Sequence, residues 1–119
     1  MAALAVENRG ILCNVLRELL PSQRALSEAA LEKKIGKEKL EEVCSLAWDF
    51  LENAVEGNLS RNERSALLVQ TTRCLIGWME SQEIPVTLST LINNFHLLPF
   101  AVDRSFPFYA KSKLLRYVI

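Results

Sequence analysis

The sequence has few residues of the kinds that carry out covalent chemistry, and their spacing argues against a catalytic or metal site. A nucleophile needs a base placed beside it, and the chain has one histidine, His96, inside an apolar stretch. That position, beside the core stripe of a predicted helix, predicts a partly buried structural histidine. The three cysteines, Cys13, Cys44 and Cys74, form no C-x-x-C pair and lack the spacing of zinc ligands. We therefore expect no catalytic, metal-binding or cofactor-binding residues.

The carboxylates and glycines lead to the same expectation. Glu38, Glu41 and Glu42 are close in sequence but interleaved with Lys37 and Lys39, which is typical of a solvated helix face with charge pairs three and four residues apart. Catalytic carboxylates need burial or a pocket to shift their pKa. The four glycines are scattered singly, so no phosphate-binding loop is present. We expect neither an enzyme nor a small-molecule substrate.

The C-terminal segment is the strongest candidate for an interaction site, because six of the nine aromatic residues follow position 94 and basic residues lie among them. The candidate residues are Arg104, Phe108, Tyr109, Lys111, Lys113 and Arg116. Aromatic rings stack on bases and cations follow the backbone, so this combination suits single-stranded nucleic acid. It also suits a protein-binding patch. In a third interpretation the aromatics pack the core and the lysines only solubilise the end.

Charge favours a protein partner over nucleic acid. The formal net charge is zero, and residues 27–56 are predominantly acidic, so the chain has no general attraction for phosphate. Residues 27–55 have the outline of a helix-turn-helix, but an acidic recognition helix would repel DNA. The first hypothesis is thus a non-enzymatic interaction, adaptor or regulatory domain. It would bind a protein partner or self-associate through either the acidic third helix or the aromatic and basic C-terminal segment. The alternative is a small nucleic-acid-associated factor that uses the C-terminal segment.

Length and composition indicate one globular domain over residues 1–119, since 119 residues with half of them hydrophobic bury a sufficient core. An odd number of cysteines in apolar helical patterns predicts reduced, buried thiols and a cytoplasmic protein. No signal peptide and no apolar run long enough for a membrane span is expected. The apolar end at 114–119 indicates either a terminus docked in the core or the N-terminal part of a longer protein.

Apolar residues recur every three or four positions, which predicts an all-α fold. We expect a compact array of five or six helices, orthogonal or bundle-like, with the fourth helix central. The first helix ends before Pro21, the second spans 22 or 27 to 35 with Gly36 as its cap, and the third spans about 37–56. The fourth opens with a capping box at 60–63 and ends near 82.

The remaining segments are predicted as a fifth helix capped by Thr87 and continuing to Leu98, a helical turn at 99–105, and a last helix from 107 in which 115–119 could equally be a strand. In the fifth helix, residues 93 and 94 are expected to face solvent. Gly77, inside the fourth helix, is expected to mark a close helix–helix approach, because glycine otherwise lowers helix stability.

Overall fold

The computed structural model describes the backbone of residues 2–54 and 60–105 and the side chains of residues 6–52 and 60–101, and it has an all-α fold. The elements are α1 (Ala2–Leu19), a 3-10 turn η1 (Pro21–Gln23), α2 (Glu28–Ile35), α3 (Lys37–Ala54), α4 (Arg61–Ser81), α5 (Leu88–Asn93), a 3-10 turn η2 (Phe95–Leu97) and α6 (Leu98–Ser105). The described ranges contain no β-strand. The predicted fold class and helix number are confirmed.

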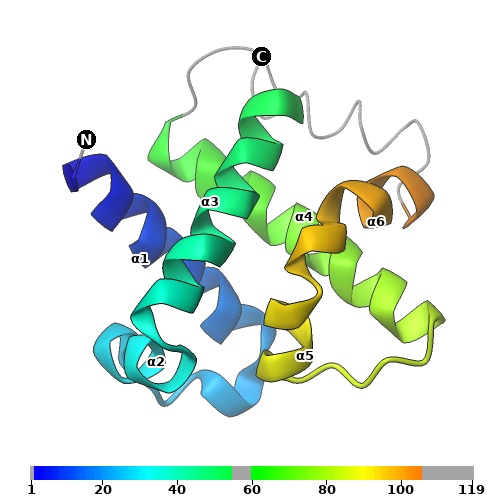
Figure 1. Ribbon diagram of the computed structural model, residues 1–119, viewed down its shortest axis with the longest axis horizontal. Coiled ribbons are helices and arrows are strands. Elements are labelled where there is room, and N and C mark those ends of the chain that lie inside the picture. Colours follow the sequence, from blue (N-terminus) through cyan, green and yellow to red (C-terminus); the bar gives the residue numbers. More distant parts are fainter. Residues whose placement is uncertain (1, 55–59, 106–119) are drawn as a thin grey trace.

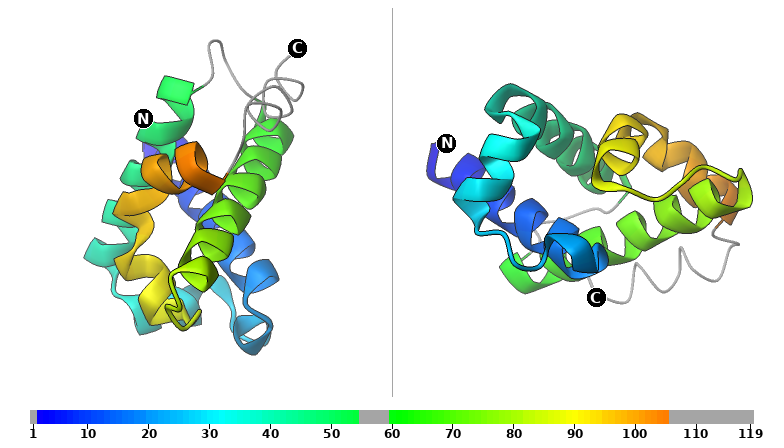
Figure 2. Two further views of the ribbon diagram at one scale, coloured as in Figure 1. Left: turned by 90° about the vertical axis from the view of Figure 1, so that its right-hand side faces the viewer. Right: turned by 90° about the horizontal axis from the view of Figure 1, so that it is seen from below.

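The helices cross steeply. In Figure 1, α1 and α4 run in the same general direction while α3 crosses both. Figure 2 shows α3 and α5 on one side of the molecule and α4 on the other. Helix α4 packs against α1, α3 and α6. The expected compact array of helices is therefore confirmed, while the central position of the fourth helix stays a prediction.

The core consists of the apolar stripes that the periodicity predicts. Side chains from four helices meet there with no exposed surface: Leu12 of α1, Leu40 of α3, Leu67 of α4 and Leu91 of α5. Val69 and Ile76 of α4 are partly buried and pack against the same core. Burial of these faces is the main source of stability for helices of this length.

The helix N-termini are capped as the sequence predicts. The Ser27 hydroxyl accepts a hydrogen bond from the Ala30 amide at 3.1 Å. Ser60 and Glu63 form the reciprocal capping box of α4, with both bonds at 3.2 Å. Thr87 caps α5 by accepting from the amide of the third helical residue. Each cap provides a partner for a backbone amide that the helix itself leaves unpaired.

Two helix C-termini use positive φ angles. Gly36 ends α2 with φ 96° and ψ 134°, so its φ is positive as expected while its ψ lies outside the left-handed helical region. At the end of α4, the Glu83 amide donates to the Glu80 carbonyl at 3.0 Å and the Ile84 amide donates to the Met79 carbonyl at 2.9 Å. This is a Schellman motif, and Glu83 holds its left-handed position with φ 59°.

The predicted fifth helix to Leu98 is wrong, because α5 ends at Asn93. Asn94 has φ −101° and ψ 4° and its side-chain amide donates to the Thr90 carbonyl at 2.7 Å, so it terminates the helix and is half-buried rather than facing solvent. In the 3-10 turn that follows, Phe95 is buried and His96 is exposed. The prediction of a partly buried histidine is wrong for the same reason: the tighter turn rotates His96 away from the core.

The expectation for Gly77 is also wrong. Gly77 is exposed, and among the described residues a Cβ atom built on it would meet nothing within 4 Å apart from its own helix backbone and chain neighbours. None of the described helices therefore approaches closely at this position. The predicted last helix from 107 and the helix-or-strand alternative at 115–119 lie outside the described residues.

Candidate functional site

The six candidate residues of the C-terminal segment are not brought into a described site. The backbone of Arg104 lies in the last turn of α6, and its side chain is outside the described residues. The other five lie wholly outside them: Phe108, Tyr109, Lys111, Lys113 and Arg116. The interaction surface proposed for this segment stays a prediction.

The described part of the chain has a groove where α2, the start of α3 and α5 meet, at the lower edge of the view in Figure 1. Its volume is about 200 Å³. The lining residues are Lys34, Ile35, Lys39, Leu88, Ser89, Ile92 and Asn93. The groove therefore joins two segments that are about fifty residues apart in the sequence.

The groove combines an apolar lining with two ammonium groups. Ile35, Leu88 and Ile92 belong to the core or pack against it, so the groove opens directly onto the hydrophobic interior. The Lys34 ammonium donates to the Gln23 Oε1 atom of η1 at 3.0 Å, which restrains that side chain. Lys39 is partly buried at the start of α3. Such a lining suits an apolar group that carries a negative charge nearby.

Helix geometry extends this apolar surface along α3. Residues of an α-helix are 100° apart, so Lys39, Val43, Leu46 and Phe50 lie within an arc of about 60°. Leu46 is 39% exposed, and Phe50 is half-buried against the core. We call this apolar surface the docking strip, and it consists of Ile35, Leu88, Ile92, Leu46 and Phe50. It begins at the two lysines and follows α3 for about three turns.

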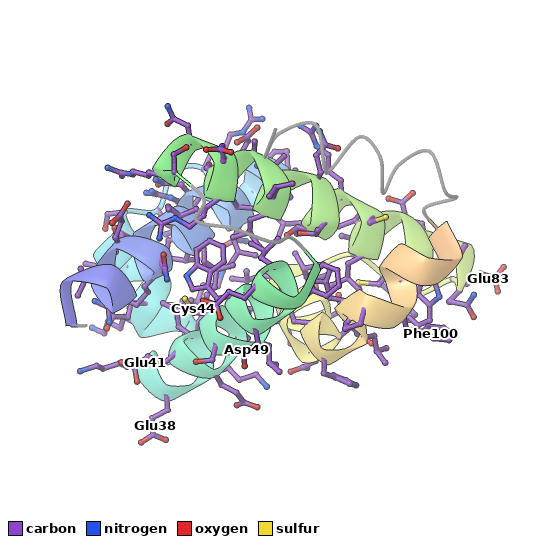
Figure 3. The ribbon with its side chains drawn as sticks, turned by 90° about the horizontal axis from the view of Figure 1, so that it is seen from above. Glu38, Glu41, Cys44, Asp49, Glu83 and Phe100 are labelled. Carbon is purple, nitrogen blue, oxygen red and sulfur yellow. The ribbon has the colours of Figure 1, made fainter. Side chains whose placement is uncertain are left out.

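An acidic row borders the docking strip on its solvent side. Glu38, Glu42, Asp49 and Glu52 are all exposed and lie within an arc of about 80° around α3. Figure 3 shows Glu38 pointing away from the body of the protein, on the side opposite α4. The docking strip is thus apolar along its length, basic at one end and acidic along one side.

Glu41 belongs to a different network. Its carboxylate lies 3.9 Å from the Arg9 guanidinium of α1, which is also 3.7 Å from the carboxylate of Glu32 in α2. These contacts link α1, α2 and α3. On the helical wheel Glu41 faces α1, away from the docking strip.

The thiols are buried and poorly nucleophilic. Burial raises the pKa of Cys13 and Cys44 from 9.0 to about 11 and that of Cys74 to about 12, so all three are protonated at neutral pH. Within the described residues, no three His, Cys, Asp or Glu side chains come together as a metal site requires. The described helices also include none with the length and hydropathy of a membrane span.

A second exposed apolar feature lies at the opposite end of the molecule from Glu38 (Figure 3). Phe100 of α6 is 45% exposed, and its ring packs edge-on against Trp78 of α4 with centroids 5.8 Å apart. This pair does not line the groove between α2, α3 and α5.

No match was found when the chain was compared with models of protein families, with characterised proteins and with solved structures. The function must therefore be argued from the geometry. Sequence reasoning missed the docking strip because its two walls come from distant segments. The only local signal was the combination of Leu46 and Phe50, whose apolar side chains lie beside the core stripe of α3 and next to its acidic face.

Proposed function

We propose that this protein is a non-enzymatic interaction domain with an adaptor or regulatory role, and that it binds a segment of a partner protein along the docking strip. The observation that supports this most strongly is the exposed side chain of Leu46, which lies on the same face of α3 as the groove residue Lys39. Contiguous apolar surface with a charged rim is typical of protein-binding sites.

The surrounding charges favour a protein partner over nucleic acid at this surface. Four exposed carboxylates border the docking strip, and they repel a phosphate backbone whose binding depends on neutralisation by cations. A protein segment can match both the acidic row and the two lysines. The alternative, a nucleic-acid-associated factor that uses residues 104–116, depends on side chains outside the described residues and stays a prediction.

Selection of peptides from a random displayed library on the immobilised full chain tests the proposal. Enriched peptides are then synthesised, and their affinities are measured for the wild-type protein, for Leu46→Asp and for the matched control Ser45→Asp. Ser45 is exposed on the same helix but lies about 100° from Leu46, off the docking strip. Both variants place the same new charge on the same turn of α3, and circular dichroism of each variant checks that it is folded.

The proposal predicts that Leu46→Asp weakens the peptides at least tenfold, because a carboxylate inside an apolar contact is desolvated without a partner. Ser45→Asp adds a carboxylate to the acidic row and should not weaken them. Absence of enriched peptides, or equal effects of both variants, would overturn it. A single-stranded oligonucleotide is titrated in parallel at low salt. Its binding, lost as salt rises, would promote the nucleic-acid alternative.

A further inference from the structure

We propose that the groove between α2, α3 and α5 binds a small amphiphilic acid in its ionised form, such as a medium-chain fatty acid. Three properties of the groove carry this: the arrangement of its apolar and polar side chains, the sign of its charges and its volume. The site does not depend on a protein partner, because neither Leu46 nor Phe50 lines the groove.

Helix α5 provides one wall of the groove, which is apolar at its base and polar at its rim. Leu88 and Ile92 are four residues apart on one row of the helix, and they are buried, with 7% and 6% of their surface exposed. Ser89 and Asn93 form the next row, and both are exposed. Ile35 of α2 is partly buried against the same core. An apolar chain can therefore lie on the base of the groove while its polar group stays at the rim.

The polar side chains of the groove are hydrogen-bond donors with unused capacity. All four of them can donate, and none is a carboxylate. Among the described residues, the side chains of Lys39, Ser89 and Asn93 form no hydrogen bond, whereas Lys34 donates to Gln23. A carboxylate, which accepts hydrogen bonds through both oxygens, matches this set of donors.

The two ammonium groups of the groove are not neutralised by the protein. Within residues 6–52 and 60–101, no carboxylate lies within 4.0 Å of the Nζ atom of Lys34 or Lys39. Glu38 precedes Lys39 but does not line the groove, and its side chain points away from the body of the protein (Figure 3). A bound carboxylate therefore meets two cations without displacing a carboxylate of the protein.

The volume of the groove limits the size of the apolar part. The groove measures about 200 Å³, and an apolar cavity of about 150 Å³ holds benzene with its six carbons. On this scale the groove takes roughly eight carbons. An acid of about that length fills the groove, while a strongly hydrated anion without an apolar part would leave the base of the groove uncovered.

Titration of the full chain with sodium octanoate, followed by NMR of the methyl groups, tests the proposal. Octanamide, which has the same apolar chain and no charge, is titrated in parallel. Lys39→Met removes the ammonium group and keeps an unbranched side chain. Lys37→Met is the matched control, because Lys37 is exposed at the start of the same helix and does not line the groove. Circular dichroism of each variant checks that it is folded.

Octanoate is expected to shift the methyl signals of Ile35, Leu88 and Ile92, with a Kd on the order of 1 mM for a ligand of this size. It should bind at least threefold more tightly than octanamide. Lys39→Met should weaken octanoate about three- to fivefold, as expected for loss of one ion pair at a partly exposed site, and should leave octanamide unchanged. Lys37→Met should change neither.

Absence of shifts at these three residues would overturn the proposal, and so would equal Kd values for octanoate and octanamide or equal effects of the two variants. The proposed function is tested separately by Leu46→Asp, which should leave octanoate binding intact because Leu46 does not line the groove. Failure of octanoate to bind, while library peptides remain sensitive to Leu46→Asp, would remove this ligand and leave the proposed function standing.

Discussion

Replacement of Gly77 by alanine is expected to stabilise the fold. Glycine inside a helix costs about 0.5–1 kcal/mol relative to alanine, because it loses more backbone freedom on folding. Within the part of the chain that the structure describes, the new methyl group would meet nothing within 4 Å outside its own helix backbone and chain neighbours, so no steric cost from these residues offsets this gain. Gly77 lies inside α4, which continues to Ser81, so the difference in helix propensity between glycine and alanine at an interior position applies.

The gain should be visible as a shift in Tm. Unfolding entropy near Tm is about 2.1 cal/mol/K per residue, or about 0.25 kcal/mol/K for 119 residues. A gain of 0.5–1 kcal/mol therefore raises Tm by about 2–4 °C. Thermal unfolding followed by circular dichroism measures the shift in Tm, and urea titration at 25 °C measures the change in the free energy of unfolding. The urea m-value should not change, because the surface exposed on unfolding is the same.

Gly36→Ala is the matched control, with the same change of side chain and the opposite expectation. Gly36 has φ 96°, a conformation that residues with a Cβ rarely adopt, although open space surrounds it. The strain should lower stability by about 1–3 kcal/mol. Destabilisation by Gly77→Ala would refute the reasoning, since it would mean that another surface packs against Gly77. Stabilisation by Gly36→Ala would contradict the backbone geometry between α2 and α3.

Four further outcomes are expected. Glu83→Gly should stabilise by about 0.5–1 kcal/mol in urea titration, because glycine adopts φ 59° without strain. Ser60→Ala should destabilise by about 1 kcal/mol through loss of the α4 capping box. Burial raises the pKa of the Cys74 thiol from 9.0 to about 12, so the unfolded chain releases its proton first. Stability should therefore fall as pH rises above about 9, with a shallower slope in Cys74→Ala. Iodoacetamide at pH 7.5 should modify Cys13 and Cys44 only at the rate of global opening, as mass spectrometry after denaturant titration would show.

Much of the fold could be predicted because its determinants are local. Helix starts depend on a side chain and an amide three residues away, so Ser27, Ser60 and Thr87 could be identified from sequence. The end of the first helix before Pro21 is equally local, because a proline disfavours the helical conformation of the residue before it. Leu20 is accordingly extended, with φ −117° and ψ 91°. The core stripes follow from the helical period, which reports the buried face of each helix.

The errors occurred where tertiary packing decided between local alternatives. The apolar period continues through 88–98, so the sequence predicted one helix, but Asn94 ends α5 and the chain turns through η2 into α6. The turn lets both Phe95 and Leu98 reach the core. Gly77 was misread for a related reason: sequence shows that a glycine is present, while only the neighbouring helices show whether anything approaches it.

The same limit explains why the docking strip could not be predicted. Periodicity identifies Ile35 and Leu88 as apolar residues on their own helices, but it does not show that α2 and α5 are neighbours. The turn at Asn94 contributes to this arrangement, because it ends α5 after six residues and lets η2 pack against α3. A continuous helix to Leu98 would carry residues 95–98 past α3 in another direction. The break that sequence reasoning missed therefore brings η2 against α3, directly after the helix that lines the groove.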